Sequence, residues 1–173
     1  IRVNGTDQNT GPIVTLNSGS STLRGGMMQT DLPSPGGVIS IGPLPTAMMP
    51  YPISFALVDG VRIVGAGLSQ PVNESGGALL PPQPWLLDSI GVRLHGTQTV
   101  SQAFPFFLPV HAWLALQGGV CRSQYQNFVR GVVISHIDIG IQLGFQTNAN
   151  QLTDNMMLGI GKYAYHLFNC SES

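Results

Sequence analysis

Charged side chains are scarce in this sequence. Lys, Arg, Asp and Glu make up 9% of its 173 residues, against roughly 25% in an average soluble domain. Lys162 is the one lysine, and the formal net charge is −1. Binding to nucleic acid or to an anionic membrane depends on clustered positive charge, so we expect neither partner.

Cysteine is equally rare. Two cysteines, Cys121 and Cys170, are too few for a disulfide framework or a zinc site. They could form one disulfide between the tail and the middle of the chain, or remain two buried thiols. A bridge requires their Cα atoms to lie within about 7 Å of each other, and the sequence leaves both alternatives open.

Long apolar runs and helical periodicity are missing as well. The longest apolar run, "FPFFLPVHAWLAL", is interrupted by Pro105 and Pro109 and falls short of the roughly 20 residues of a membrane span. No stripe of apolar residues at helical spacing persists without Gly or Pro. The chain begins with Ile1, and we expect an upstream part to have been removed.

What is present predicts an all-β fold. Short apolar stretches alternate with turn residues at intervals of about ten, a pattern typical of an antiparallel sandwich or barrel with little or no helix. Of these we expect an antiparallel β-sandwich of jelly-roll or fibre-head-like type. Asp59-Gly60 between Ile53–Val58 and Val61–Val64 predicts a β-hairpin. Residues 1–30 are expected to be a stalk end or the first strands, and residues 31–173 a single β-sandwich domain. We identify no internal repeat of fixed period.

The segment "GVVISHIDIGIQLGFQT", residues 131–147, has the clearest pattern. One side carries Ile137, Ile139, Ile141, Leu143 and Phe145, and the other carries His136, Asp138, Gly140, Gln142 and Gly144. This period of two predicts one long strand with a buried face and a face in water.

The same strand raises the question of catalysis. His136 and Asp138 share the predicted wet face, but their Cβ atoms would lie roughly 7 Å apart, too far for a carboxylate to orient a catalytic base. The best local nucleophiles, Ser75 and Cys121, do not stand in a nucleophile motif. The four histidines show no metal-ligand spacing. We therefore expect no enzyme activity, no catalytic residue, no metal and no cofactor.

About the last seventy residues of the chain resemble a known family. The alternating strand, the polar turn "QTNANQLTDN" and the closing "MMLGIGKYAYHLFNCSES" look like the C-terminus of avian adenovirus fibre heads. The segment "FFLPVHAWLALQGGVC" is similar to the middle of such heads. The resemblance implies a fibre-head-like β-sandwich that forms a homotrimer on the virion surface and binds a host receptor.

These observations favour a receptor-binding head or protrusion domain of a viral or phage fibre or spike, with a host protein or glycan as partner. The alternatives are an extracellular carbohydrate-binding or adhesion module of β-sandwich type and a structural capsid domain. The predicted binding surface comprises the loops 70–84, 118–127 and 147–155. The candidate receptor-binding residues are Asn73, Trp85, Gln124, Tyr125 and Asn148.

Overall fold

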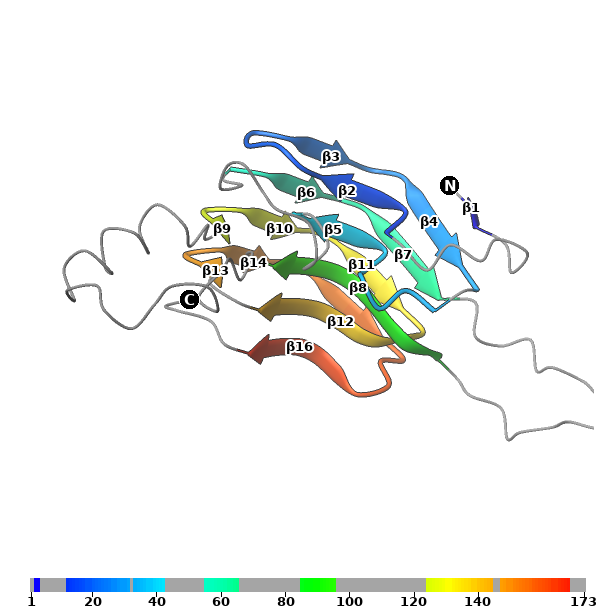
Figure 1. Ribbon diagram of the computed structural model, residues 1–173. Coiled ribbons are helices and arrows are strands. Elements are labelled where there is room, and N and C mark those ends of the chain that lie inside the picture. Colours follow the sequence, from blue (N-terminus) through cyan, green and yellow to red (C-terminus); the bar gives the residue numbers. More distant parts are fainter. Residues whose placement is uncertain are drawn as a thin grey trace, which may run out of the picture.

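The structure is a computed structural model of the chain, and it describes residues 2–3, 12–31, 33–42, 55–65, 85–95, 124–144 and 147–168. The described residues form sixteen strands and no helix (Figure 1). None of the described residues forms a helix that could cross a membrane. The strands are β1 (Arg2–Val3), β2 (Val14–Leu16), β3 (Thr22–Arg24), β4 (Met27–Thr30), β5 (Ile39–Ile41), β6 (Leu57–Asp59), β7 (Arg62–Gly65), β8 (Leu86–His95), β9 (Gln124–Tyr125), β10 (Phe128–Arg130), β11 (Val133–Ser135), β12 (Ile137–Gly144), β13 (Thr147–Asn148), β14 (Gln151–Thr153), β15 (Met156–Leu158) and β16 (Tyr163–Phe168).

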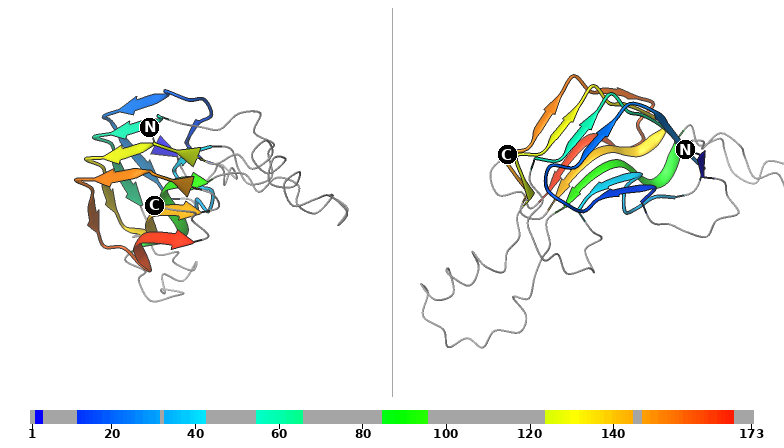
Figure 2. Two further views of the ribbon diagram at one scale, coloured as in Figure 1. Left: turned by 90° about the vertical axis from the view of Figure 1, so that its left-hand side faces the viewer. Right: turned by 90° about the horizontal axis from the view of Figure 1, so that it is seen from above.

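Every pair of these strands is parallel, so the predicted antiparallel β-sandwich is wrong. Sheet A has the order β1-β4-β7-β11-β15, sheet B the order β16-β12-β8-β5-β2, and sheet C the order β14-β10-β6-β3. The chain visits sheets C, A and B in turn, and each visit adds the next strand along each sheet. The result is a parallel β-solenoid, whose turns we call rungs. Figure 2, right, looks down the stack of rungs, and Figure 1 shows the sheet B strands running opposite to the others.

Left-handed backbone conformations form the corners between the sheets. The corner from sheet C to sheet A carries a residue with φ near +60° in each of four rungs, namely Gly25, Gly60, Gly131 and Asp154. The corner before sheet C likewise has a residue with positive φ in each of four rungs, namely Ser20, Phe55, Gln126 and Ala149. One such residue turns an extended chain sharply, and Gly does so without a steric penalty.

The predicted hairpin at Asp59-Gly60 is therefore also wrong. Leu57–Asp59 lies in sheet C and Arg62–Gly65 lies in sheet A, so the two strands diverge instead of pairing. The same Asp-Gly signal that closes a hairpin supplies the left-handed residue of a solenoid corner, because both structures need positive φ at that point.

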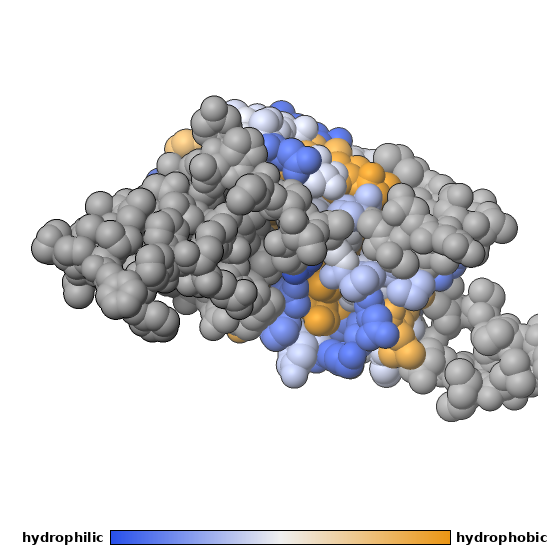
Figure 3. All heavy atoms as spheres, in the orientation of Figure 1, coloured by the Kyte–Doolittle hydropathy of each residue, from blue (hydrophilic) through white to orange (hydrophobic). Residues whose placement is uncertain are grey.

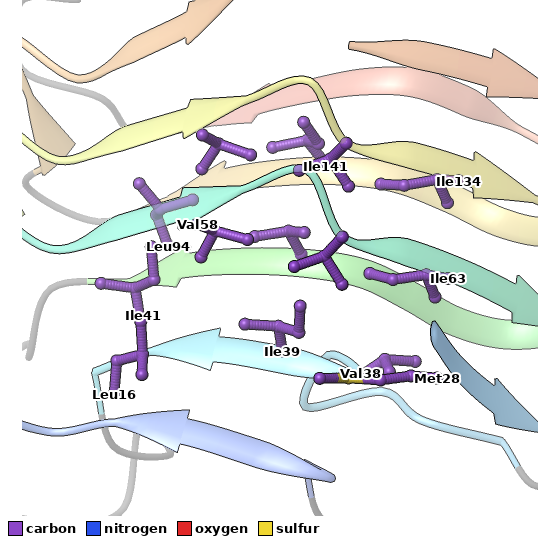
Figure 4. Close-up of a cluster of buried hydrophobic side chains, with 14 of the residues drawn as sticks. Leu16, Met28, Val38, Ile39, Ile41, Val58, Ile63, Leu94, Ile134 and Ile141 are labelled. Carbon is purple, nitrogen blue, oxygen red and sulfur yellow. The ribbon is translucent and has the colours of Figure 1, made fainter. Parts of the chain in front are cut away.

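The core is a stack of apolar side chains in rows that run across the rungs, and every one of the three sheets contributes to it (Figure 4). Parallel register places similar residue types above one another. The rows are Leu16-Ile41-Leu94-Leu143 in sheet B, Met28-Ile63-Ile134-Met157 in sheet A and Leu23-Val58-Val129-Leu152 in sheet C. Each fully buried aliphatic side chain contributes about 1.5–3 kcal/mol relative to an exposed one, so the rows are the main stabilising element.

The long strand predicted over residues 131–147 is divided by a corner. His136, with φ 55°, separates β11 from β12. Ile137, Ile141 and Leu143 are in the core as the alternation predicts. The opposite side is not a water face, because Asp138 and Gln142 are buried; this part of the prediction is wrong.

The rungs form a repeat that the sequence does not reveal. Phe128 pairs with Gln151, 23 residues further on, but Leu57 pairs with Phe128 across 71 residues. The connections differ so much in length that no fixed period is visible in the sequence. The three strands β2, β3 and β4, all within the first thirty residues, pair directly with β5, β6 and β7 of the later chain.

Candidate functional site

The structure separates the predicted receptor-binding residues. Gln124 and Tyr125 form β9, which pairs with β13, so Asn148 lies next to Tyr125. Trp85 comes directly before β8, at the opposite end of sheet B from β9 and β13 (Figure 1). Asn73, Cys121 and Cys170 lie outside the described residues, and so does the possible disulfide.

Asp138 is one of the described residues with a buried polar side-chain atom that has no hydrogen-bond partner. It follows the His136 corner at the start of β12, and its side chain is only 2% exposed. Lys162 Nζ donates a hydrogen bond to Asp138 Oδ2 over 2.7 Å. Asp138 Oδ1 is also buried, yet it has no hydrogen-bond partner among the described residues. Because a buried polar atom normally has a partner, this oxygen requires an explanation.

The backbone of the last two rungs holds the Asp138–Lys162 pair. Gly161 donates its N–H to the carbonyl of Ile137 over 3.0 Å, and Lys162 donates its N–H to the carbonyl of Asp138 over 2.7 Å. The hydrogen bond and the negative charge of Asp138 raise the pKa of Lys162, with a smaller contribution from Asp88 and against a small desolvation effect. Lys162 is therefore a fixed ammonium group at the corner between sheets A and B.

Trp85 completes this corner. A Cβ on Gly161 would collide with Trp85 Nε1 and would lie 2.7 Å from Asp138 Oδ1. The missing side chain of Gly161 thus leaves the space that the indole and the carboxylate share. Trp85 is half-buried, so part of the ring remains available to solvent. We call Trp85, Asp138 and Lys162 the corner site.

His136 belongs to the same corner but not to a catalytic pair. Its backbone N–H donates to the carbonyl of Leu158 over 2.9 Å, and its carbonyl accepts from the N–H of Leu86 over 2.8 Å. Its ring lies against Gly159. Asp138 is bonded to Lys162, and the described hydrogen bonds include none between His136 and Asp138. No group of three potential metal ligands occurs among the described residues.

The sequence singles out two residues of this corner, each for a different role, and not the third. Trp85 is a candidate receptor-binding residue, whereas Asp138 is considered for catalysis and set aside. Lys162 lies 24 residues after Asp138, which is about one rung. That spacing, together with its being the one lysine of the chain, could have revealed the pair if the repeat had been recognised.

The corner site can bind through three kinds of contact. The indole offers an apolar ring and an N–H donor, Asp138 Oδ1 is an acceptor, and Lys162 is a cation with donors beyond the one that it gives to Asp138. An apolar surface with a few convergent polar groups is typical of a binding site for a small polar ligand.

Comparison with known proteins does not identify a family for this chain. No protein-family model, no curated protein and no solved structure matches this chain.

Proposed function

We propose that this chain is the receptor-binding part of a viral or phage spike, and that it attaches to a host-cell glycan at the corner site. The observation that carries the proposal is the buried Asp138 Oδ1, which has no hydrogen-bond donor among the described residues, next to a half-buried indole. The low charge of the chain supports recognition of a polar, uncharged ligand over recognition of a polyelectrolyte.

A sugar suits the three groups of the corner site. The C–H face of a pyranose ring packs on an indole, while its hydroxyl groups donate hydrogen bonds to a carboxylate. Because Asp138 Oδ1 is not accessible to solvent, a hydroxyl group reaches it only when Trp85 moves away from Gly161. Trp85 would then act both as the cover of the acceptor and as the stacking surface.

The corner site is independent of the fibre-head resemblance. That resemblance implied an antiparallel sandwich, which the parallel sheets contradict. The homotrimer and the virion location were implied by the same resemblance and stay predictions. A β-solenoid suits attachment for a different reason: its stacked rungs place Asp138 on β12 and hold Trp85 and Lys162 directly before β8 and β16, and this reduces the entropy lost on binding.

A glycan array tests the proposal. We expect wild-type protein to bind a defined set of glycans, and Trp85→Ala to abolish that binding. Asp138→Asn should weaken it about tenfold to a hundredfold, the usual effect of losing a hydrogen bond to a charged group. Phe55→Ala is the matched control, since Phe55 is an exposed aromatic residue at a different corner. Glycan binding that survives both corner variants would refute the site, and an array without any hit would refute the ligand class.

A further inference from the structure

Sheet B carries a row of polar side chains on the face opposite the core. Four neighbouring strands contribute one residue each in register, namely Ser40 of β5, Arg93 of β8, Gln142 of β12 and His166 of β16. Ser40, Arg93 and Gln142 each stand between two residues of the hydrophobic core, and successive side chains of a strand point to opposite faces. We call these four residues the outer row. Neighbouring strands are about 4.8 Å apart, so each residue of the outer row lies beside the next.

Arg93 is the member of the outer row whose hydrogen bonds are incomplete. Its Nε atom is buried and has no hydrogen-bond partner among the described residues. Burial lowers the pKa of Arg93 from its ordinary value, and no carboxylate of the described chain offsets this effect. The group remains a cation at neutral pH nevertheless. A partly buried cation without an anionic neighbour is energetically costly; Arg24 and Arg130, by contrast, both pair with Asp59.

The residues on either side of Arg93 are uncharged and already bonded. Ser40 Oγ donates a hydrogen bond to the carbonyl of Gly42 over 2.7 Å. Gln142 Nε2 donates to His166 Nδ1 over 3.0 Å. The outer row therefore offers one fixed positive charge with a planar set of N–H donors, and no acid within the row competes for it.

An aromatic ring lies next to the outer row. Tyr163 stacks on His166 with 4.9 Å between the ring centroids, and it is 51% exposed. In Figure 3, which shows the same side as Figure 1, hydrophilic (blue) and hydrophobic (orange) surface adjoin over the lower part of the described chain. An apolar ring beside a few polar groups is typical of a site for a small polar ligand, and a sugar ring presents the matching C–H face.

We propose that Arg93 binds the carboxylate group of an acidic sugar, at a site on sheet B that is separate from the corner site. The guanidinium group presents Nε–H and Nη–H as a planar fork that matches the two oxygens of a carboxylate. One arginine neutralises one carboxylate, whereas a phosphate group, with a charge of about −1.5 to −2 at pH 7, needs more than one cation. Arg93 is partly exposed, so the ligand approaches from solvent, and a change of side-chain torsion then presents Nε to it.

The outer row and the corner site lie along the same two strands. Gln142 follows Asp138 by four residues in β12, and His166 follows Lys162 by four residues at β16. Four residues of extended chain span about 13 Å. The two sites therefore do not share a ligand-binding residue, and either can be lost without the other.

An NMR titration with the sodium salt of methyl glucuronide tests the outer row, with methyl glucoside as the neutral comparison. We expect the wild type to bind the glucuronide and to bind the glucoside at least about tenfold more weakly. Arg93→Gln should bind the glucuronide about tenfold to a hundredfold more weakly than the wild type. Arg62→Gln, which removes an exposed arginine of β7, and Trp85→Ala should both bind it like the wild type.

Thermal unfolding and two small anions complete the test. Arg93→Gln removes a partly buried charge, so its unfolding temperature should equal or exceed that of the wild type. Acetate should bind more weakly than the glucuronide, and inorganic phosphate no more tightly.

Five results would each overturn the proposal: no binding of the glucuronide, equal binding of the glucoside, equal binding by Arg93→Gln, acetate as tight as the glucuronide, or phosphate tighter than it. None of them alters the expected effect of Asp138→Asn on glycan binding, so failure of the outer row is distinguishable from failure of the corner site.

Discussion

At the scale of single residues, the two partners of the Lys162–Asp138 ion pair differ in burial. Asp138 is buried, while the Lys162 side chain is about half exposed. Removing the lysine therefore leaves a buried carboxylate without its cation, whereas removing the carboxylate leaves a lysine in water. The two deletions are not equivalent, although they break the same 2.7 Å hydrogen bond.

This pair predicts a specific pH dependence of stability. The pKa of Lys162 is raised above its ordinary value of 10.5 by Asp138. The stabilisation is therefore fully present below pH 10.5 and is lost as the pH rises through the raised pKa of the folded state. We expect wild-type protein to lose more unfolding free energy than Lys162→Met across that alkaline window, measured by urea unfolding at a series of pH values. Lys162→Arg, which stays charged, should not show the loss at all.

Two glycine-to-alanine substitutions distinguish the energetic cost of backbone strain from the cost of a steric collision. Gly60 has φ 62° and open space where a Cβ would lie, so Gly60→Ala should cost about 1 kcal/mol from the left-handed conformation alone. Gly140 has no such φ, but its Cβ would lie 2.5 Å from the carbonyl oxygen of Ala164 and 2.7 Å from Met157 Sδ. We expect Gly140→Ala to cost about 2–3 kcal/mol through overpacking. Urea unfolding of both variants checks the order, and a larger loss for Gly60→Ala would contradict the packing of β12 against β16.

At the scale of elements, a short asparagine ladder joins the corners that lead into sheet C. Asn127 Oδ1 accepts the N–H of Ala56 over 2.9 Å, and Asn127 Nδ2 donates to Asn150 Oδ1 over 3.0 Å. The ladder thus connects three consecutive rungs. It fixes the register of the parallel strands, which hydrophobic rows of similar residues alone would specify less strictly.

The ladder is tested by Asn127→Ala. Asn127 is fully buried, so the variant leaves the N–H of Ala56 without its acceptor. The cost should be about 2 kcal/mol, within the usual penalty for an unsatisfied buried group. Asn127→Ser provides the comparison, because Ser21 occupies the equivalent position one rung before Ala56. Equal stability of Asn127→Ala and wild type in thermal and urea unfolding would show that the ladder does not stabilise the corners.

The positions of the strands could be predicted from the sequence better than the way in which the strands pair. The apolar stretches around Leu57, Ile63, Val92 and Ile141 are strands as expected. The predicted pairing of these strands was wrong, because a left-handed Gly between two short strands is compatible both with a hairpin and with a corner. Alternation also predicted a wet face on β12. It could not show that Lys162, from the next rung, covers Asp138.

At the scale of the whole molecule, the solenoid could have been found only through its repeat. Equivalent positions in sheet C are Thr22, Leu57, Phe128 and Gln151, whose unequal separations hide the period. The pattern of short strands and turns predicted a sandwich, and the resemblance to a fibre head implied one as well, because strands, polar turns and a low charge are common to both architectures. Of the proposed corner site, the sequence singles out Trp85 at the junction of a loop and a strand, whereas the proximity of Asp138 and Lys162 depends on the rung spacing.

Attachment through the buried carboxylate is best tested by calorimetric titration of the strongest array glycan into wild-type protein and into Asp138→Asn. We predict one glycan per chain for the wild type and an affinity about tenfold to a hundredfold lower for the variant, with the fold retained by circular dichroism. Superimposable titrations of the two proteins would contradict the assignment of Asp138, and with it the corner site, as the place of attachment.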